Sequence, residues 1–407
     1  MLLYFEILFA IVLLYNSFKS FVKKRFMFFL FSIFTLFYVI IRQILLLSDN
    51  YVKFSILNTN INEFNIQSIM YVFIFTVISY VVVSYIYFNT SNKYNRNIKY
   101  SEYSSVELPK VVMGLISVLV IIFVNPMFGL PFIVYLLIYY IYKYGFNIIT
   151  LLFLIIVFYL FTFSIDRRDY LFLLLSLIFI YFSKIDKISI LKVILIGCIS
   201  MSILIYLLIA FRTDGLFEFT AVVNRINDIP FIFIFEIEAD FPIVTDDLIN
   251  LFDLLLIQNK IDFLYGIEFI KPIYSIIPRE IWDTKPISIA SLFAIITNPE
   301  WYYSTGGSLP LTIYGEVFWN FGYLSFIIFI IIGYVMKKLD KGIEYNILHN
   351  NPNISIYIVC ISLSFHLLRG PVDNFWMLYL FLFIFIFMEQ LLRNIIKSNI
   401  KGEIKNV

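Results

Sequence analysis

Uninterrupted apolar stretches recur along almost the whole chain, and they constrain the fold more than any other feature of the sequence. Eleven are long enough to cross, or nearly cross, a hydrocarbon core about 30 Å thick as α-helices. The chain is 61% apolar and 14% charged, with a mean hydropathy of +0.90, outside the range of soluble globular domains. We therefore predict an all-α polytopic membrane protein with about eleven transmembrane helices (about ten to twelve). The stretches are 2–18, 26–47, 66–88, 109–124, 129–142, 147–164, 169–183, 188–211, 321–337, 354–368 and 373–392.

Helix-breaking residues lie between and within two neighbouring stretches, 109–124 and 129–142. Asn125-Pro126 and Pro131 interrupt the apolar run between Val111 and Tyr142. Proline lacks a backbone N–H and its ring clashes with the preceding turn, so a broken or re-entrant helix is an alternative to two complete spans here.

One long segment, Arg212 to Pro310, is not dominated by apolar runs. It divides the chain into an N-terminal membrane bundle of about eight spans (1–211), a large loop (212–310) and a C-terminal bundle of about three spans with a tail (311–407). Within the loop, Thr245 precedes two acids and the apolar run Leu248 to Ile257. We expect a helix with Thr245 as its N-cap, lying on the membrane or packed on the bundle.

Basic residues in the short connections predict the orientation, because cytoplasmic loops are enriched in lysine and arginine. Alternate connections and the C-terminal tail carry eighteen on one side and four on the other. This places the C-terminus in the cytoplasm and the large loop outside. The loop holds fourteen acids and six basic residues, and these six are Arg212, Arg225, Lys260, Lys271, Arg279 and Lys285.

Several common functional classes are excluded by what the sequence lacks. The net charge of +2 favours no nucleic-acid partner. The chain has two histidines, and no CxxC, HExxH, GxxxxGK[ST] or paired-aspartate sugar-nucleotide motif, which predicts no metal and no nucleotide cofactor. Cys198 and Cys360 lie in apolar stretches and are interpreted as packed core residues.

Four arginines stand at or near the predicted outer face: Arg42, Arg212, Arg279 and Arg369. Snorkelling or helix pairing explains Arg42 and Arg212 as well as a function does. Arg279 follows Pro278 in a loop rather than on a helix face, so snorkelling explains it less well. A guanidinium binds two phosphate oxygens through a planar fork and stays charged, so converging arginines suit a lipid-linked diphosphate.

The sequence HLLRGPVDN places His366, Arg369 and Asp373 at one outer rim, with the first two on the same helix face. His366 is a candidate general base near neutral pH, or a packed polar residue bonded to a neighbouring helix. Glu316, in TIYGEVFWNFG, is a competing base or an orienting carboxylate. The remaining loop acids, among them Asp246, Asp247 and the group Glu236, Glu238 and Asp240, are interpreted as a solvated surface.

The large outer loop, IPREIWDTKP within it, GGSLPLTIYGEVFWNFG after it and the late arginine of HLLRGPVDN together resemble the O-antigen polymerase (Wzy) or oligosaccharide repeat-unit polymerase family. The resemblance implies a metal-independent inverting glycosyltransferase with a GT-C-like fold in the bacterial inner membrane. It implies transfer of the growing glycan from undecaprenyl diphosphate to the non-reducing end of the next lipid-linked unit. A chain-length regulator and a flippase are the implied protein partners.

The same resemblance implies roles for particular residues. Arg279 and Arg369 match the loop and late arginines, and Arg212 or Arg225 the early loop arginine. Further substrate or diphosphate contacts are assigned to Lys285, Arg42 and Asp373, and the catalytic set to His366, Glu316, Arg369 and Arg279. A flippase for the lipid-linked oligosaccharide, an O-antigen ligase and a membrane scaffold without enzymatic activity are the competing interpretations.

Overall fold

The computed structural model describes residues 1–48, 65–89, 107–161, 167–185, 240–267, 282, 286–370 and 372–405. Every regular element in these ranges is a helix, which confirms the predicted all-α class. Ten of the eleven predicted apolar stretches coincide with described helices, and 188–211 lies outside the described residues. Among the described residues, five helical segments are long and apolar enough to cross a membrane: Leu2–Val22, Phe26–Leu47, Ile66–Asn89, Thr312–Leu348 and Trp376–Ile396. Five shorter apolar helices accompany them in the same ranges.

The chain divides into two compact units. Unit 1 comprises Met1–Phe88, Ile185–Glu344 and Ser364–Trp376. Unit 2 comprises Asn89–Lys184, Tyr345–Leu363 and Met377–Val407. Unit 1 therefore combines residues from all three predicted parts of the chain.

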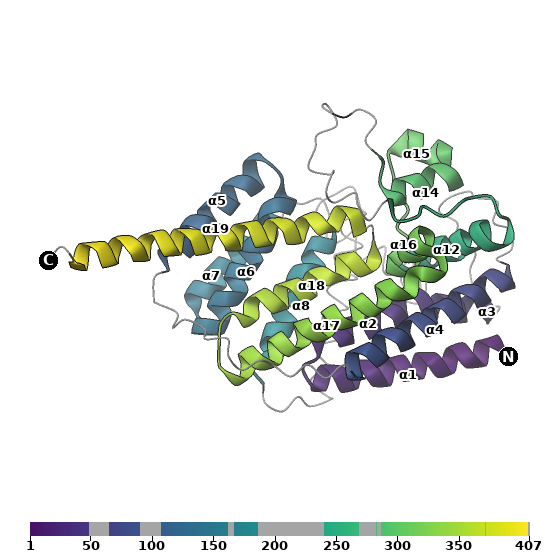
Figure 1. Cartoon of the computed structure of the whole chain (residues 1–407), viewed down its shortest axis with the longest axis horizontal. Helices are drawn as coiled ribbons and strands as arrows, with labels where there is room; N and C mark the ends of the chain where they lie inside the picture. The colour runs from purple at the N-terminus through teal and green to yellow at the C-terminus, as the bar shows by residue number, and fades with distance from the viewer. Residues whose placement is uncertain are drawn as a thin grey trace, which may run out of the picture. The chain divides into compact units, whose positions relative to one another are not determined.

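The helices of unit 1 come from both halves of the chain (Figure 1). In chain order they are α1 (Leu2–Val22), α2 (Phe26–Thr35), the π-helix η1 (Leu36–Ile40), α3 (Ile41–Leu47), α4 (Ile66–Asn89), α12 (Asp240–Phe252), the π-helix η3 (Asp253–Ile257), α14 (Ile289–Thr297), α15 (Pro299–Thr305), α16 (Thr312–Phe321), the 3₁₀ turn η4 (Gly322–Leu324) and most of α17 (Ser325–Leu348).

Aromatic rings fill the space between α1, α2, α4 and α17. Phe9 of α1 packs edge-on against Phe73 and Tyr80 of α4, and Phe31 of α2 stacks on Tyr80. The backbones of α4 and α17 approach closely at Gly333, where a Cβ would lie 2.9 Å from the carbonyl oxygen of Val83. A small residue at such a crossing is typical of helices packed within membranes.

Asp340 of α17 binds the start of α2. Its two carboxylate oxygens accept hydrogen bonds from the backbone N–H groups of Met27 and Phe28 at 2.7 and 3.1 Å, and Oδ2 also accepts one from the hydroxyl of Tyr87 at 2.8 Å. The first N–H groups of a helix have no partner within the helix, so this carboxylate supplies the cap that Arg25 does not.

The loop helix α12 begins earlier than predicted. It starts at Asp240 rather than at Thr245, and Thr245 is not its N-cap: its hydroxyl donates to the carbonyl oxygen of Tyr38 at 2.8 Å. Leu248 and Leu251 pack against Gly315 of α16. Of the two predicted settings for this helix, packing on the bundle is the one observed.

The helices lying wholly in unit 2 are α5 (Leu108–Phe123), α6 (Pro126–Tyr144), α7 (Ile148–Phe161) and α8 (Arg167–Ser183). The proline-divided stretch is thus a pair of helices, with Pro126 as the first residue of α6. Gly129 lies so close to Ser117 of α5 that any Cβ would clash with its backbone. The remaining helices, α18 (Ile354–Arg369) and α19 (Val372–Lys405), are divided between the two units.

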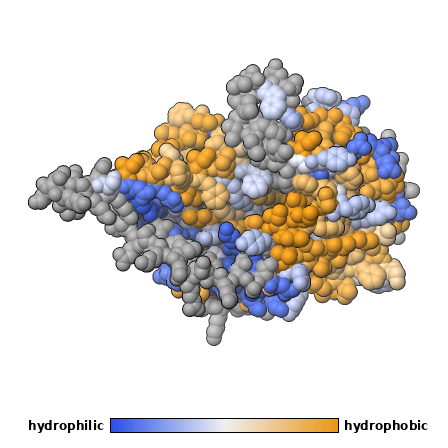
Figure 2. All heavy atoms as spheres, in the orientation of Figure 1, coloured by the Kyte–Doolittle hydropathy of each residue, from blue (hydrophilic) through white to orange (hydrophobic). Residues whose placement is uncertain are grey.

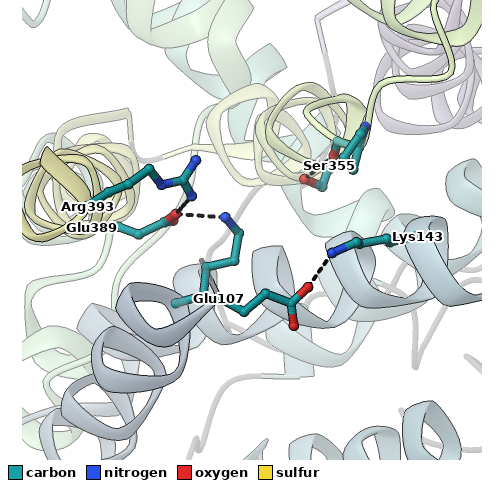
Figure 3. Close-up of polar contacts among 7 residues, drawn as sticks. Glu107, Lys143, Ser355, Glu389 and Arg393 are labelled. Atoms are coloured by element: carbon teal, nitrogen blue, oxygen red, sulfur yellow. Dashed lines mark hydrogen bonds and ion pairs between the residues drawn. The ribbon is translucent and has the colours of Figure 1, made fainter. Parts of the chain in front are cut away.

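A buried ionic group ties α5 to α19 within unit 2. Glu389 accepts from Lys110 at 2.7 Å and also pairs with Arg393 one turn along α19, and these groups are mostly enclosed. Figure 3 shows Glu389 between its two cations, and Glu107 paired separately with Lys143. The Glu107–Lys143 pair is about one third exposed (33% and 32%), so water screens it more than the first pair.

Unit 1 exposes broad apolar surface over α1, α4 and α17 (Figure 2). Examples are Leu8, Ile74, Val81, Ile327 and Ile331, each about half exposed. Apolar side chains on the outside and polar ones such as Ser32, Thr35 and Arg42 inside are what a hydrocarbon solvent selects. Cys360 is buried, as predicted, whereas Cys198 lies outside the described residues.

Candidate functional site

Charged and polar side chains meet inside unit 1 where α3, α12, α16 and the end of α18 come together. We call this group the polar cluster. Its members are Arg42, Asp246, Asp247, Thr312, Glu316, His366, Arg369 and the glycine Gly370. Charged groups are rarely buried unless they are paired or functional, so a cluster of this size marks a candidate site.

Arg42 anchors the cluster to the N-terminal helices. Its Nε and Nη2 donate to Asp246 Oδ1 and Oδ2, both at 3.0 Å, in the two-pronged geometry of strong arginine–carboxylate pairs. Arg42 is 2% exposed and is held by α12 rather than snorkelling. Its third nitrogen, Nη1, has no hydrogen-bond partner among the described residues.

The π-helix η1 directly precedes α3, which carries Arg42. A π-helical turn inserts extra backbone and changes the direction of the side chains that follow, and such turns are frequent at functional sites. In this chain the π-helical turn precedes the residues of α3, and Arg42 on α3 points toward Asp246 of α12.

Asp247 is buried and Asp246 is mostly enclosed, with 17% of its side chain exposed, so the prediction that they form a solvated surface is wrong. Burial raises the pKa of Asp246 to about 6, although the bonds from Arg42 oppose the shift. Burial also raises the pKa of Asp247 well above its ordinary value, with the charge of Asp246 adding to the effect and that of Arg369 opposing it. Asp247 Oδ2 has no hydrogen-bond partner among the described residues.

The reason for this error lies in the helical periodicity of α12. Val244, Asp247, Leu248 and Leu251 are spaced three, four and seven residues apart and share the buried face of the helix. Asp247 therefore occupies a position that the pattern reserves for an apolar residue. An acid at an apolar position of a helical pattern was the sequence signal that could have indicated a site here, because a buried acid needs a partner or a function.

Glu316 lies against the end of α18. A Cβ added at Gly370 would fall well inside 3.0 Å of Glu316 Oε1, so the carboxyl group occupies the space that a side chain at 370 would need. Gly370 also has a φ of 82°, in the left-handed region that favours glycine. The backbone nitrogen of Thr312 lies 3.6 Å from the same point.

Thr312 is strained. It is a β-branched residue with a φ of 60°, where non-glycine residues are uncommon and branched ones are outliers. Its hydroxyl is fully buried and has no hydrogen-bond partner among the described residues. Backbone strain of about 1–3 kcal/mol persists only where surrounding structure enforces it, and such positions gather at functional sites.

The predicted rim at the end of α18 is observed in part. His366 and Arg369 lie in the last turn of that helix, as expected, with His366 fully buried and Arg369 half-buried. Asp373 belongs to the first turn of α19, and its side chain lies outside the described part of the structure.

Four predicted site residues, Arg212, Arg225, Arg279 and Lys285, lie outside the described residues. The structure thus brings together Arg42, Glu316, His366 and Arg369 from the predicted set, and it adds Asp246, Asp247 and Thr312. Thr312 was missed because no residue pattern in the sequence signals a positive φ at threonine.

The described residues contain no group of three or more His, Cys, Asp or Glu side chains that could hold a metal ion. The cluster instead offers cations, carboxyl groups and a hydroxyl, which suits a polar, anionic organic ligand. Comparison with known protein families, curated proteins and solved structures finds no match for this chain.

Proposed function

We propose that this protein is a membrane glycosyltransferase that polymerises lipid-linked oligosaccharide repeat units of the O-antigen or capsule type. The growing glycan moves from undecaprenyl diphosphate onto the non-reducing end of the next lipid-linked unit. The proposal places the protein in the bacterial cytoplasmic membrane, with about eleven spans, the 212–310 loop outside and the C-terminus in the cytoplasm.

One observation carries the proposal: three buried polar atoms from three different helices of the polar cluster lack a partner among the described residues. They are Arg42 Nη1, Asp247 Oδ2 and Thr312 Oγ1. A buried polar atom without a hydrogen bond is costly, by about 1–3 kcal/mol, so a site that retains three of them is suited to a polar ligand. A scaffold without a ligand gains nothing from this arrangement.

The chemistry needs two functions from the protein. The departing diphosphate carries negative charge, which arginines neutralise through paired hydrogen bonds. Arg369 is the half-buried candidate in the cluster, and Arg279 of the large loop remains a predicted second one. Arg42 is held by Asp246 through Nε and Nη2, so it offers the donors of Nη1 rather than a full fork. The attacking hydroxyl needs a base, and the cluster holds several carboxyl groups and His366.

The test is reconstitution of the purified full-length chain in proteoliposomes with undecaprenyl-diphosphate-linked repeat units, read as glycan length on a gel. We expect a ladder of polymers. Arg369→Ala should lower the rate about 100- to 1,000-fold, the usual effect of losing one contact to developing negative charge. Lys338→Ala, which removes an exposed cation of α17, is the control and should leave the ladder intact.

A deletion strain separates the competing functions. Loss of a polymerase leaves a single repeat unit on the lipid carrier or on the lipopolysaccharide core, whereas loss of a flippase or a ligase removes the surface glycan altogether. Full-length chains in the deletion strain would contradict the proposal.

A further inference from the structure

Asp247 differs from the other acids of the polar cluster in the contacts that its carboxyl group makes. Both oxygens of Asp246 are occupied by Arg42. The carboxyl group of Glu316 is pressed against the backbone of Gly370. Asp247 Oδ2 is buried and has no hydrogen-bond partner among the described residues.

Asp247 is also the most accessible of the three candidate bases. Its residual exposure is 8%, compared with 2% for Glu316 and 0% for His366. It lies on α12, which belongs to the loop segment rather than to one of the long apolar helices.

We propose that Asp247 is the general base of the polymerase reaction, binding the attacking hydroxyl of the acceptor sugar through Oδ2. This inference rests on the function proposed above. In the step, the hydroxyl oxygen forms a bond to the anomeric carbon of the donor glycan while its proton passes to Asp247 Oδ2. The bond from that carbon to the diphosphate oxygen breaks, and undecaprenyl diphosphate leaves with the electron pair.

The charged surroundings of Asp247 fit this role. The charged groups that act on it are Asp246, which Arg42 holds, and Arg369 of α18. Burial and the neighbouring Asp246 raise the pKa of Asp247, which makes its carboxylate a stronger base than an exposed aspartate. Asp246 and Asp247 thus form a pair of carboxyl groups in different surroundings, and in other enzymes such a difference lets one group act as the base while its neighbour takes another role.

The proteoliposome assay tests the inference. Loss of a general base typically costs about 100- to 10,000-fold in rate, so we expect Asp247→Asn to lose at least about 100-fold in polymerisation rate. Binding of the lipid-linked repeat unit should persist, because the amide still offers a polar contact. Activity of the natural protein should rise with pH along a limb that is missing in Asp247→Asn.

Two further variants test whether the loss of activity comes from a change in folding rather than from the loss of the base. Asp247→Glu keeps the carboxyl group and moves it by one methylene, so it should be folded, slow and still pH-dependent. Asp253→Asn removes a carboxylate of the adjoining η3 that accepts from Ser68 at 2.8 Å, and it should polymerise at close to the natural rate.

The outcomes are distinguishable. If the natural protein polymerises and Asp247→Asn works within about five-fold of it, the assignment of the base is overturned while the proposed function stands. If the natural protein makes no polymer from lipid-linked repeat units, the proposed function fails and this inference fails with it.

Discussion

Arg42 and Asp246 lie 204 residues apart in the chain and are joined by two hydrogen bonds of 3.0 Å. The first stands on a helix of the N-terminal bundle and the second on the loop helix α12. The pair therefore fixes a helix of the loop segment against the N-terminal helices, and it places the next residue, Asp247, beside Arg369. Four predictions follow from this arrangement and from related contacts.

Breaking the Arg42–Asp246 pair should destabilise unit 1. Arg42→Ala leaves a buried carboxyl group without its partner, which typically costs about 3–5 kcal/mol. Arg42→Ala combined with Asp246→Ala should cost less than the sum of the two single changes, because neither charge remains. Thermal unfolding of the four proteins in detergent measures this coupling. Additive effects would show that the pair is not energetically linked.

Gly370→Ala should damage the site more than the same change at another glycine with positive φ. The added methyl group would clash with Glu316 Oε1 and also strain a φ of 82°. Gly306 has a φ of 67° and open space around it, so Gly306→Ala reports the strain alone, about 1 kcal/mol. We expect Gly370→Ala to lose most polymer synthesis and Gly306→Ala to retain it. Equal behaviour of the two variants would argue against close packing at Gly370.

The two acid–base pairs of unit 2 should differ in importance. Glu389→Gln leaves Lys110 and Arg393 close together and mostly buried without their shared carboxylate, so a loss of about 3–5 kcal/mol is expected. Glu107→Gln breaks a pair that is about one third exposed, and it should cost at most about 1 kcal/mol. The difference in unfolding midpoint between the two variants is the measurement, and a larger effect at Glu107 would contradict the burial argument.

Stability should fall as the pH rises through the acidic range. Asp246 and Asp247 both have a raised pKa in the folded protein, so the folded state holds their protons more tightly than the unfolded state does. This contribution is complete below the ordinary pKa of 3.8 and is lost as the pH passes the folded value, about 6 for Asp246. Asp247→Asn should flatten the upper part of the profile and melt no lower than the natural protein near pH 7.

The control for this profile is Asp253→Asn, because Asp253 is partly exposed and shares the adjoining turn. Its profile should follow that of the natural protein. If Asp247→Asn keeps the natural slope at every pH, the buried carboxyl group of Asp247 is not the source of the pH dependence.

Helix positions were largely determined by the sequence. Apolar runs of transmembrane length leave the backbone no other way to satisfy its hydrogen bonds in hydrocarbon, so α1, α4 and α6 begin and end within a few residues of their predicted limits. The end of α18 at Arg369 is likewise local, because Gly370 directly after it adopts a positive φ that favours glycine.

The membership of the site was decided by tertiary structure. Whether Asp247 faces water or protein depends on which helix covers α12, and the partner of Arg42 lies 204 residues away in the chain. The strain at Thr312 and the contact between Glu316 and Gly370 also arise only when α16 meets the end of α18. Local patterns fix where a helix forms because its hydrogen bonds are local, but the pairing of buried charges depends on contacts between distant segments, which no local pattern encodes.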